Sequence, residues 1–411
     1  MRLDFGVTRA PQRLIFGPGQ RAALGHLARD LGRRALICTD ERLGGLQVVN
    51  DLVADLEAHG ISVEIFSETQ PELPLDCIVG CVARYKDFGP DMVIGFGGGS
   101  CIDLAKLVSL LLTFPGPLSS YYGEFKVPGP LHPVIAIPTT AGTGSEATPV
   151  AVLADPERVM KVGISSPQLI PHTSICDPEL TVSCPKGLTA ISGADALAHA
   201  IEGFAAVSRE ATPNLATTRV FVGKNTLSDI YALRAIPLIY DHLETAVSQP
   251  SNIHARSAVM LGSTLAGLAF GTAGTAAAHA IQYPIGAETH TAHGLGVGVL
   301  LPFTMRFNAS VAAKAYAEIA WEIGVAPTGA NDASAADALI DALSTLFARI
   351  DLPRTLDKIG VTPGSLDSIA SLSMNAARLV ENNPRPLSPE SIRSILDAAM
   401  GTSRDSEETV E

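Results

Sequence analysis

The chain has 411 residues, of which 46% are apolar and 17% charged, so it can build a large buried core and is not a disordered chain. Its 29 Lys and Arg against 42 Asp and Glu give a net charge of −13, which argues against a nucleic-acid groove or an anionic membrane surface as a partner and leaves small metabolites. Six cysteines without a CxxC pair, and an N-terminus without an apolar signal segment, favour a reduced cytoplasm.

The first part of the chain predicts a parallel sheet covered by helices. Short β-branched or apolar runs alternate with amphipathic stretches up to about residue 185. We expect strands at 34–39, 62–66, 92–96 and 133–137, and helices between them that include 45–59 and 75–86. These elements predict an α/β domain over residues 1–186.

Beyond this point the strand signals fade and one helical pattern follows another. We expect helices at 190–205, 229–247, 254–280, 312–323 and 333–350, in an all-helical domain over residues 187–411 with a frayed acidic tail at 401–411. The uncharged segment from 257 to 287 is long enough to span a bilayer, but it is rich in Gly, Ala, Ser and Thr. We therefore expect a buried helix pair and no membrane partner.

Two loops in the first domain have the composition of a phosphate-binding site. The segment MVIGFGGGSCIDLAK places Gly97, Gly98 and Gly99 between a strand and a helix, with Ser100 expected as the helix cap. A second run, PTTAGTGSEAT at 138–148, also follows a strand. Because the carboxyl ends of parallel strands meet at one edge of a sheet, the two loops should converge there, although an ordinary tight turn would have the same composition.

The acidic residue after the expected strand 34–39 bears on the choice of nucleotide. Asp40 stands where a carboxylate can accept the hydroxyls of an adenosine ribose and repel a 2′-phosphate, which favours NAD over NADP. A solvated turn residue or a helix N-cap is the alternative interpretation of Asp40.

Four polar residues in the apolar helical part suggest a metal site. Asp195 and His199 are i and i+4 on one expected helix, His279 lies near the end of the uncharged segment, and His293 follows fourteen residues later. One carboxylate with three imidazoles suits Fe²⁺, Zn²⁺ or Mn²⁺ better than Ca²⁺ or Mg²⁺. Each histidine alone could equally be a core or surface residue.

These motifs together resemble the iron-containing (group III) alcohol dehydrogenase family. The resemblance is carried, in order, by GGGSCIDLAK, PTTAGTGSE, DPEL, GADALAHAIE, HAIQYPIGA and the HG pair at His293, and it covers nearly the whole chain. It implies a dinucleotide-binding α/β domain with a parallel sheet and an all-α metal-binding domain, in a dehydroquinate synthase-like arrangement, with the cofactor and the metal in the cleft between them. It also implies a homodimer.

The resemblance assigns roles to individual residues. Fe²⁺, with Zn²⁺ as the alternative, would be bound by Asp195, His199, His279 and His293. The cofactor positions of the family fall on Asp40, Gly97, Gly98, Gly99, Ser100, Asp103, Thr139, Thr140 and Thr143, with Lys161 near the nicotinamide ribose.

The sequence departs from the common family pattern near the metal ligands. Many family members have a proton-relay histidine four residues beyond the first ligand of the HAIQYP run, and here Tyr283 occupies that position. His290 is a candidate outer base, or an exposed loop residue. Residues 210–224 lengthen a connection, and both this insertion and the Tyr resemble the hydroxyacid-oxoacid transhydrogenase branch. The metal-free maleylacetate reductase branch fits less well because all four ligand positions are filled.

The expected reaction is reversible hydride transfer between NAD(H) and a small primary or secondary alcohol, with the metal as a Lewis acid. Hydroxyacid-oxoacid transhydrogenation, or oxidation of a substrate such as 4-hydroxybutyrate, is the alternative, and a nucleotide-binding protein without activity is a remote one. An anionic substrate needs a cation, and the segments around the ligands are poor in Lys and Arg. This favours a neutral alcohol or aldehyde, unless Arg158, Lys161 or the 210–224 insertion supplies the charge.

Overall fold

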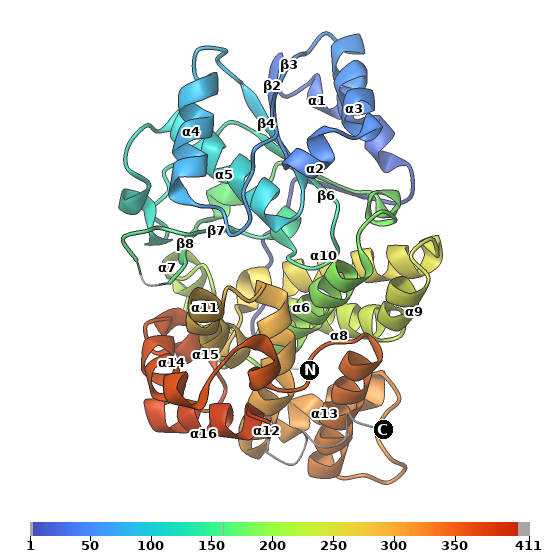
Figure 1. The fold of residues 1–411 in the computed structure, drawn as a ribbon, viewed down its shortest axis with the longest axis vertical. Coiled ribbons are helices and arrows are strands. Elements are labelled where there is room, and N and C mark those ends of the chain that lie inside the picture. Colours follow the sequence, from blue (N-terminus) through green and yellow to red (C-terminus); the bar gives the residue numbers. More distant parts are fainter. Residues whose placement is uncertain (1–2, 159, 402–411) are drawn as a thin grey trace.

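The computed structural model describes residues 3–158 and 160–401, and the predicted frayed tail lies, apart from Gly401, outside the described residues. The chain forms an α/β half followed by a helical half (Figure 1). This confirms the predicted fold class. The last strand of the main sheet ends at Cys176 and the long helix that opens the helical half begins at Lys186, while the division into two domains at residue 186 stays a prediction.

The α/β half is built on a twisted parallel sheet. Among the described residues this sheet has six strands in the order β1-β9-β6-β4-β2-β3, and every recorded pairing within it is parallel. The strands are β1 (Arg13–Phe16), β2 (Arg34–Cys38), β3 (Ser62–Phe66), β4 (Met92–Gly97), β6 (Val134–Pro138) and β9 (Thr173–Cys176). A smaller sheet contains β5 (Gly123–Glu124), β7 (Val150–Leu153) and β8 (Val162–Ser165).

Both faces of the main sheet are covered, because successive strand residues point to opposite sides. On β2, Leu36 and Cys38 pack with one hydrophobic cluster and Ala35 and Ile37 with another. The covering helices are α1 (Leu24–Ala28), α3 (Gln47–Ala58), α4 (Leu75–Tyr85) and α5 (Gly99–Thr113), and a short α2 (Glu41–Gly44) follows β2. This burial on both sides explains why the central strands read as continuous apolar runs.

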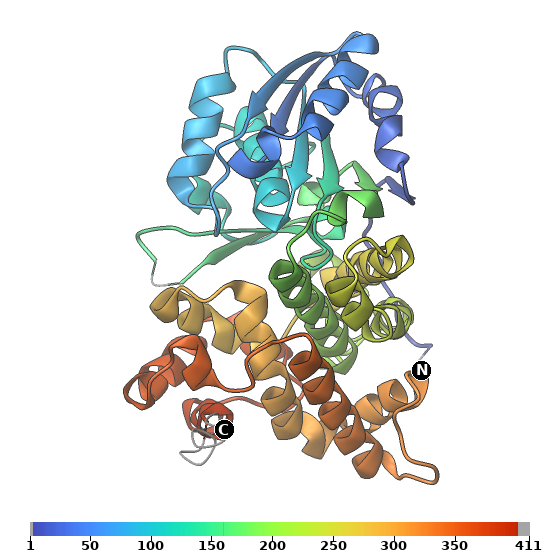
Figure 2. The same ribbon diagram turned by 45° about the vertical axis from the view of Figure 1, so that its right-hand side comes forward.

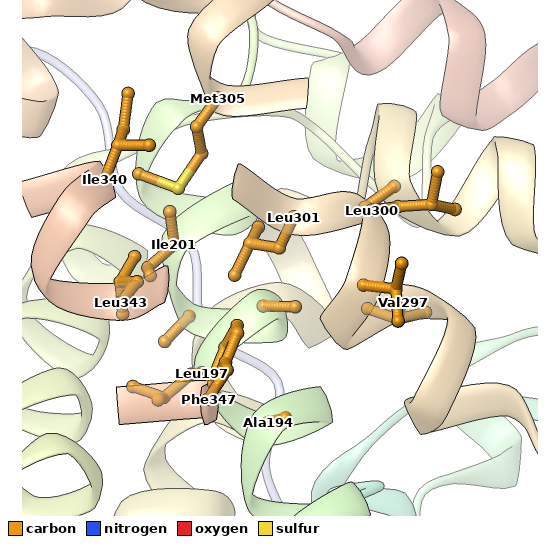
Figure 3. Close-up of a cluster of buried hydrophobic side chains, with 14 of the residues drawn as sticks. Ala194, Leu197, Ile201, Val297, Leu300, Leu301, Met305, Ile340, Leu343 and Phe347 are labelled. Atoms are coloured by element: carbon orange, nitrogen blue, oxygen red, sulfur yellow. The ribbon is translucent and has the colours of Figure 1, made fainter. Parts of the chain in front are cut away.

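The helical half packs around α6 (Lys186–Ala205) and α12 (His293–Glu322). Figure 3 shows α6, α12 and α13 (Asp332–Arg349) meeting through apolar side chains that include Leu197, Leu301 and Phe347. The other helices are α7 (Leu215–Thr218), α8 (Thr226–Tyr240), α9 (Leu243–Ser248), α10 (Ile253–Ala273), α11 (Ala277–Thr289), α14 (Leu366–Ser373), α15 (Ala377–Asn382) and α16 (Pro389–Ala399).

Two of the predicted long helices are broken, and here the prediction was wrong. The segment 229–247 is divided between α8 and α9. The segment 254–280 is divided between α10 and α11, which are bent by 100° where Gly274 adopts a φ of 81°. A positive φ is readily adopted by glycine and ends the helix there.

By length and composition, α12 could cross a membrane, and so could α10 with α11 if they were continuous. Within the described residues, however, 61% of the apolar window of α12 is buried inside the protein, and the second pair is sharply bent. Both belong to the packed helical core (Figure 2).

Candidate active site

Four polar side chains meet where α6, α11 and α12 converge. Asp195 and His199 lie one turn apart on α6, His279 lies in the first turn of α11, and His293 is the first residue of α12. The Oδ1 atom of Asp195 is 3.8 Å from Nε2 of His199, 3.6 Å from Nε2 of His279 and 3.9 Å from Nε2 of His293. The structure therefore brings together all four side chains predicted as metal ligands.

The imidazole rings are packed against one another, and one of them also stacks on a phenylalanine ring. The ring centroids of His199 and His279 are 4.8 Å apart, those of His279 and His293 are 5.3 Å apart, and His199 stacks on Phe270 at 4.1 Å. The Nδ1 atom of His199 lies 3.2 Å from the carbonyl oxygen of Gly142. Donation from Nδ1 to this carbonyl leaves the lone pair of Nε2 free to face Asp195.

A buried carboxylate, which sequence reasoning missed, lies behind His279. Oε2 of Glu202 is 2.6 Å from Nδ1 of His279 and accepts the backbone N–H of Ala276 at 2.8 Å, while Oε1 accepts the N–H of Ala278 at 2.7 Å. Glu202 thus holds the start of α11 and orients the His279 ring at once. The sequence does contain a signal for Glu202, because Asp195, His199 and Glu202 follow the i, i+4, i+7 spacing of one helical face.

Burial and charge together set the protonation of this cluster. Burial lowers the pKa of His199 to about 4 and that of His293 to about 3, so both rings are neutral near pH 7. Burial opposes the charged form of His279 too, but the Glu202 and Asp195 carboxylates outweigh it and raise its pKa to about 9. Burial opposes the carboxylate of Asp195, yet the surrounding imidazoles hold its pKa well below the usual range.

The ligand set fits a divalent transition metal. Among the described residues, Oδ1 of Asp195 and Nε2 of His279 are buried without a hydrogen-bond partner, which is costly unless something else binds them. One ligand atom from each of Asp195, His199 and His279 lies within 4.8 Å of the others, and His293, whose side chain is 27% exposed, stands at the open side. A carboxylate with imidazoles, one of them backed by a carboxylate on its outer nitrogen, is the chemistry of Fe²⁺ and Zn²⁺ sites, and a metal that binds there displaces the proton that His279 carries near pH 7.

The ligands face a cavity of about 980 Å³ that runs between the two halves. It reaches the carboxyl ends of the neighbouring strands β6, β4 and β2, where open α/β sheets bind ligands. The predicted site residues that line it are Asp40, Gly98, Gly99, Ser100, Asp103, Thr139, Thr140, Thr143, Lys161, Asp195, His199, His279, Tyr283 and His293. Gly97 and His290 are not among its lining residues.

The two predicted phosphate-type loops lie against each other at this edge. A Cβ at Gly99 would stand 2.8 Å from Cγ2 of Thr143, so only glycine permits their close approach. Gly97 has a φ of 151°, and a Cβ there would overlap Cys101. The expectation that Ser100 caps α5 was wrong, because the N-cap is Gly98 and Ser100 lies inside the first turn. The first residues of this 15-residue helix, Gly99 and Ser100, nevertheless line the cavity, so the N-terminus of the helix lies at the cavity edge.

The N-cap interpretation of Asp40 is confirmed, and its contact with the adenosine ribose stays a prediction. Its Oδ1 atom accepts the backbone N–H of Leu43 at 2.8 Å and so caps α2, and the residue also lines the cavity. Lys161 directly precedes β8 of the small sheet and lines the cavity. It forms an ion pair with Glu72, and burial lowers its pKa to about 8.

Asp103 holds the second loop in place through a buried network. Its carboxylate accepts the hydroxyl of Ser145 and, at 2.9 Å, the N–H of Val152. The fully buried Lys106 donates to Ser145 Oγ at 3.0 Å and to the carbonyl of Val150 at 2.8 Å. Asp103 therefore borders the cavity while its charge is used to order the loop.

Comparison with known sequences decides the family. Residues 11–178 match the family described as iron-containing alcohol dehydrogenase, and residues 189–400 match the C-terminal domain of the Fe-containing alcohol dehydrogenase family. The chain belongs to the iron-containing alcohol dehydrogenase family. It is thus an oxidoreductase, and the predicted resemblance is confirmed.

Individual members of this iron-containing alcohol dehydrogenase family align over almost the full chain. Sulfoacetaldehyde reductase of Bilophila wadsworthia (strain 3_1_6) is 35% identical over 94% of this chain and 97% of its own. The mitochondrial hydroxyacid-oxoacid transhydrogenase of Bos taurus is 28% identical over 97% of this chain and 90% of its own.

Solved structures of the family share the fold. A crystal structure of 1,3-propanediol oxidoreductase superposes with a TM-score of 0.90 at 31% identity, over 96% of this chain and all of that chain. Sulfoacetaldehyde reductase from Bifidobacterium kashiwanohense, solved in complex with NAD⁺, gives a TM-score of 0.82 at 26% identity, over 98% of this chain and all of that chain.

The residues near the family's relay position differ in their placement. Tyr283 lines the cavity, with its ring centroid 6.0 Å from that of His293, and burial raises the pKa of its hydroxyl. His290 ends α11 in a left-handed conformation and is exposed. The structure does not bring His290 to the metal ligands, so its role as outer base stays a prediction.

Sequence reasoning missed two further residues that line the cavity. Arg378 on α15 and Phe221 from the 210–224 insertion line the cavity together, and the Arg378 guanidinium carbon lies 4.0 Å from the centroid of the Phe221 ring. Arg378 lies far in sequence from every motif, and no local pattern indicated it. The cavity therefore contains an arginine in addition to the predicted Lys161, although the sequence around the ligands is poor in cations.

Proposed function

We propose that the protein is a metal- and NAD(H)-dependent oxidoreductase that interconverts a small primary or secondary alcohol and its aldehyde or ketone. One observation carries the proposal: the buried, unpartnered ligand atoms of Asp195 and His279 face the same cavity as the glycine loop at the start of α5. A metal site and an anion-binding helix end thus share one space, as hydride transfer between a dinucleotide and a substrate requires.

In this proposal, Asp195, His199, His279 and His293 hold Fe²⁺, with Zn²⁺ as the alternative. A divalent metal there would supply a Lewis acid that polarises the substrate carbonyl. Glu202 keeps the His279 ring oriented, and Phe270 excludes water from one face of His199. In reduction, a hydride moves from C4 of NADH to the carbonyl carbon and a proton joins the oxygen, so that NAD⁺ and the alcohol are formed.

Tyr283 is the residue at the family's relay position, and its hydroxyl can act on the substrate. Tyr283 is a neutral phenol near pH 7, as tyrosine ordinarily is, and burial raises its pKa further, so it can donate a hydrogen bond into the cavity. We propose Tyr283 as a donor that orients the substrate. Relay through the nicotinamide ribose hydroxyl and water, with Lys161 near that ribose, stays a prediction, as do the cytoplasmic location, the homodimer and the absence of nucleic-acid and membrane partners.

The remaining cofactor contacts follow from the lining residues. We propose that Gly98, Gly99, Ser100, Thr139, Thr140 and Thr143 surround the pyrophosphate and the nicotinamide side, while Gly97 and Asp103 shape their loops. Asp40 would accept the adenosine ribose hydroxyls. Support comes from the NAD⁺ complex of the Bifidobacterium kashiwanohense relative.

The test is metal analysis combined with NADH absorbance. Full-length protein reconstituted anaerobically with Fe²⁺ should bind one metal ion per chain and oxidise NADH when aldehydes such as propanal are added. Asp195→Asn is the matched control, because it keeps the side-chain shape while removing the charged ligand. Failure to bind metal, together with unchanged NADH across an alcohol and aldehyde panel, would refute the proposal.

A second candidate is hydroxyacid-oxoacid transhydrogenation. The observation in its favour is that the 210–224 insertion supplies Phe221 to the cavity, opposite the half that carries the glycine loop. Its test is whether 4-hydroxybutyrate reduces tightly bound cofactor that 2-oxoglutarate then reoxidises without added NAD. If 2-oxoglutarate does not reoxidise the bound cofactor and turnover requires exchange of bound NADH for free NAD⁺, the protein is a dehydrogenase instead.

A further inference from the structure

Arg378 is a cation in the cavity wall that forms no ion pair with a carboxylate among the described residues. Its Nη1 atom is buried and has no hydrogen-bond partner among residues 3–158 and 160–401, and none of the ion pairs found within these ranges includes it. We propose that Arg378 binds an anionic group, a carboxylate or a sulfonate, at the end of the substrate remote from the reacting carbon. This inference rests on the proposed function and names the substrate class of the same site.

The guanidinium group is held in place from several sides. It stacks at 4.0 Å on Phe221, whose neighbour Val222 donates its N–H to the carbonyl of Thr272 at 2.8 Å. One turn further along α15, Asn382 donates to the carbonyl of Ala273 at 2.9 Å. These contacts connect both α15 and the insertion to the bend between α10 and α11. They therefore hold the Arg378 side chain in a fixed position.

Arg378 also lies close to the proposed reaction centre. Its Nη1 atom is 3.5 Å from the place that a Cβ at Gly274 would occupy, five residues before the ligand His279. Its positive charge opposes the rise that burial causes in the pKa of Tyr283, which shares the cavity with it. Tyr283 in turn lies 6.0 Å from His293 between ring centroids. A short substrate could therefore reach both the ligand cluster and Arg378.

The other cations that line the cavity either have a carboxylate partner or lie at its far end. Lys161 is paired with Glu72, and Arg42 is exposed beside Asp40 at the far end of the cavity. Glu124, a carboxylate that acts on Arg378 at a distance, is bonded through Oε2 to the N–H of Val220 at 2.6 Å. Burying a charged donor without a partner is costly, and an anionic ligand would offset that cost.

Arginine suits both anions considered. Its planar fork of N–H donors matches the oxygens of a carboxylate or a sulfonate, and the aromatic ring beneath it leaves its edge free to donate. The experiment therefore measures kcat/KM with NADH for two pairs of aldehydes in which an anionic group at the remote end of one member replaces the methyl group of the other. The pairs are 4-oxobutanoate with butanal, and sulfoacetaldehyde with propanal.

We expect the Fe²⁺-loaded wild-type protein to prefer the anionic member of at least one pair. In Arg378→Met, the ratio of anionic to neutral kcat/KM should fall by about 10- to 100-fold, mainly through KM, as for loss of a hydrogen bond to a charged group. Arg378→Lys should restore part of the ratio. Arg306→Met, at an exposed arginine paired with Asp341 outside the cavity, is the matched control and should leave the ratio unchanged.

A second measurement uses the wild-type protein alone and does not depend on folding of a variant. Ethanesulfonate should inhibit butanal reduction competitively, and uncharged diethyl sulfone at equal concentration should not. Equal ratios in wild type and Arg378→Met, absence of competition by ethanesulfonate, or a raised KM for NADH as the main effect in Arg378→Met would overturn the assignment while the dehydrogenase proposal stands. If no aldehyde of either class is reduced, the proposed function itself fails.

Discussion

Replacing Glu202 by Gln should weaken both the helical half and the metal site. In the native side chain, Oε2 accepts the Ala276 N–H and faces Nδ1 of His279, and Oε1 accepts the Ala278 N–H. An amide has the same shape but one oxygen fewer, so its NH₂ group must face at least one of these buried donors. Hydrogen bonds to charged groups contribute about 1.5–3 kcal/mol each, and we therefore expect a loss of about 2–4 kcal/mol in the free energy of unfolding.

The effect on metal binding is separable from the effect on folding. Without the carboxylate, the His279 ring loses the partner that fixes its tautomer, and loss of such an outer partner typically costs 10- to 100-fold in affinity. Urea unfolding of metal-free protein gives the first quantity, and competition with a chelator gives the second. Glu244→Gln, at a half-exposed residue paired with Arg349, is the control and should change the free energy of unfolding by less than about 1 kcal/mol. Unchanged stability and unchanged metal affinity in Glu202→Gln would refute the reasoning.

Three further changes test other parts of the structure. Asp195→Asn should abolish stoichiometric metal binding and lower turnover by more than the 10- to 100-fold typical of outer partners, as measured by metal analysis and NADH oxidation; full metal occupancy would contradict the ligand assignment. Asp40→Ser keeps an oxygen to cap α2 while removing the charge, so the kcat/KM ratio of NADPH to NADH should rise about 10-fold, and an unchanged ratio would exclude a role in nucleotide choice. Burial lowers the pKa of Lys106 to about 8, so the unfolded chain binds more protons between pH 8 and about 10.5. The free energy of unfolding of wild type relative to Lys106→Met should therefore increase with pH over that window, and a flat difference would show that Lys106 does not titrate as the structure indicates.

The parts of the fold that could be predicted are those whose signal is local. The strand over 62–66 is the same in sequence and structure, and β2, β4 and β6 differ from prediction by one or two residues at their ends. The apolar runs of β2, β4 and β6 suffice because both faces of the sheet are buried there, whereas the edge strand β3 shows an alternation of exposed and more buried residues. The edge strand β1 and the small sheet were missed, since their short, half-exposed segments give no comparable pattern. The buried strand β9 was missed too, because its sequence TSIC is short and half polar.

The breaks in the helical half depend on contacts that periodicity does not contain. The sequence from 254 to 280 reads as one apolar helix, but the carboxylate of Glu202 binds the N–H groups of Ala276 and Ala278 and so starts a new helix there. The same limit applies to the site. Asp195, His199, His279 and His293 were predicted because imidazole and carboxylate are rare in apolar sequence, whereas Arg378 owes its place to the packing of α15 against the bend.

Helix α6 carries Asp195, His199 and Glu202 on one face, while its opposite side, with Leu197 and Ile201, is packed between α12 and α13 (Figure 3). The two ligand atoms and the oxygen that orients a third ligand therefore move as one body when the helix shifts or turns. A substitution in the apolar layer beneath α6, remote from any reacting atom, would shift Asp195, His199 and the Glu202 oxygen together relative to His293 on α12. The geometry of this centre can thus be changed by substitutions in the packing of α6 as well as by substitutions of its ligands.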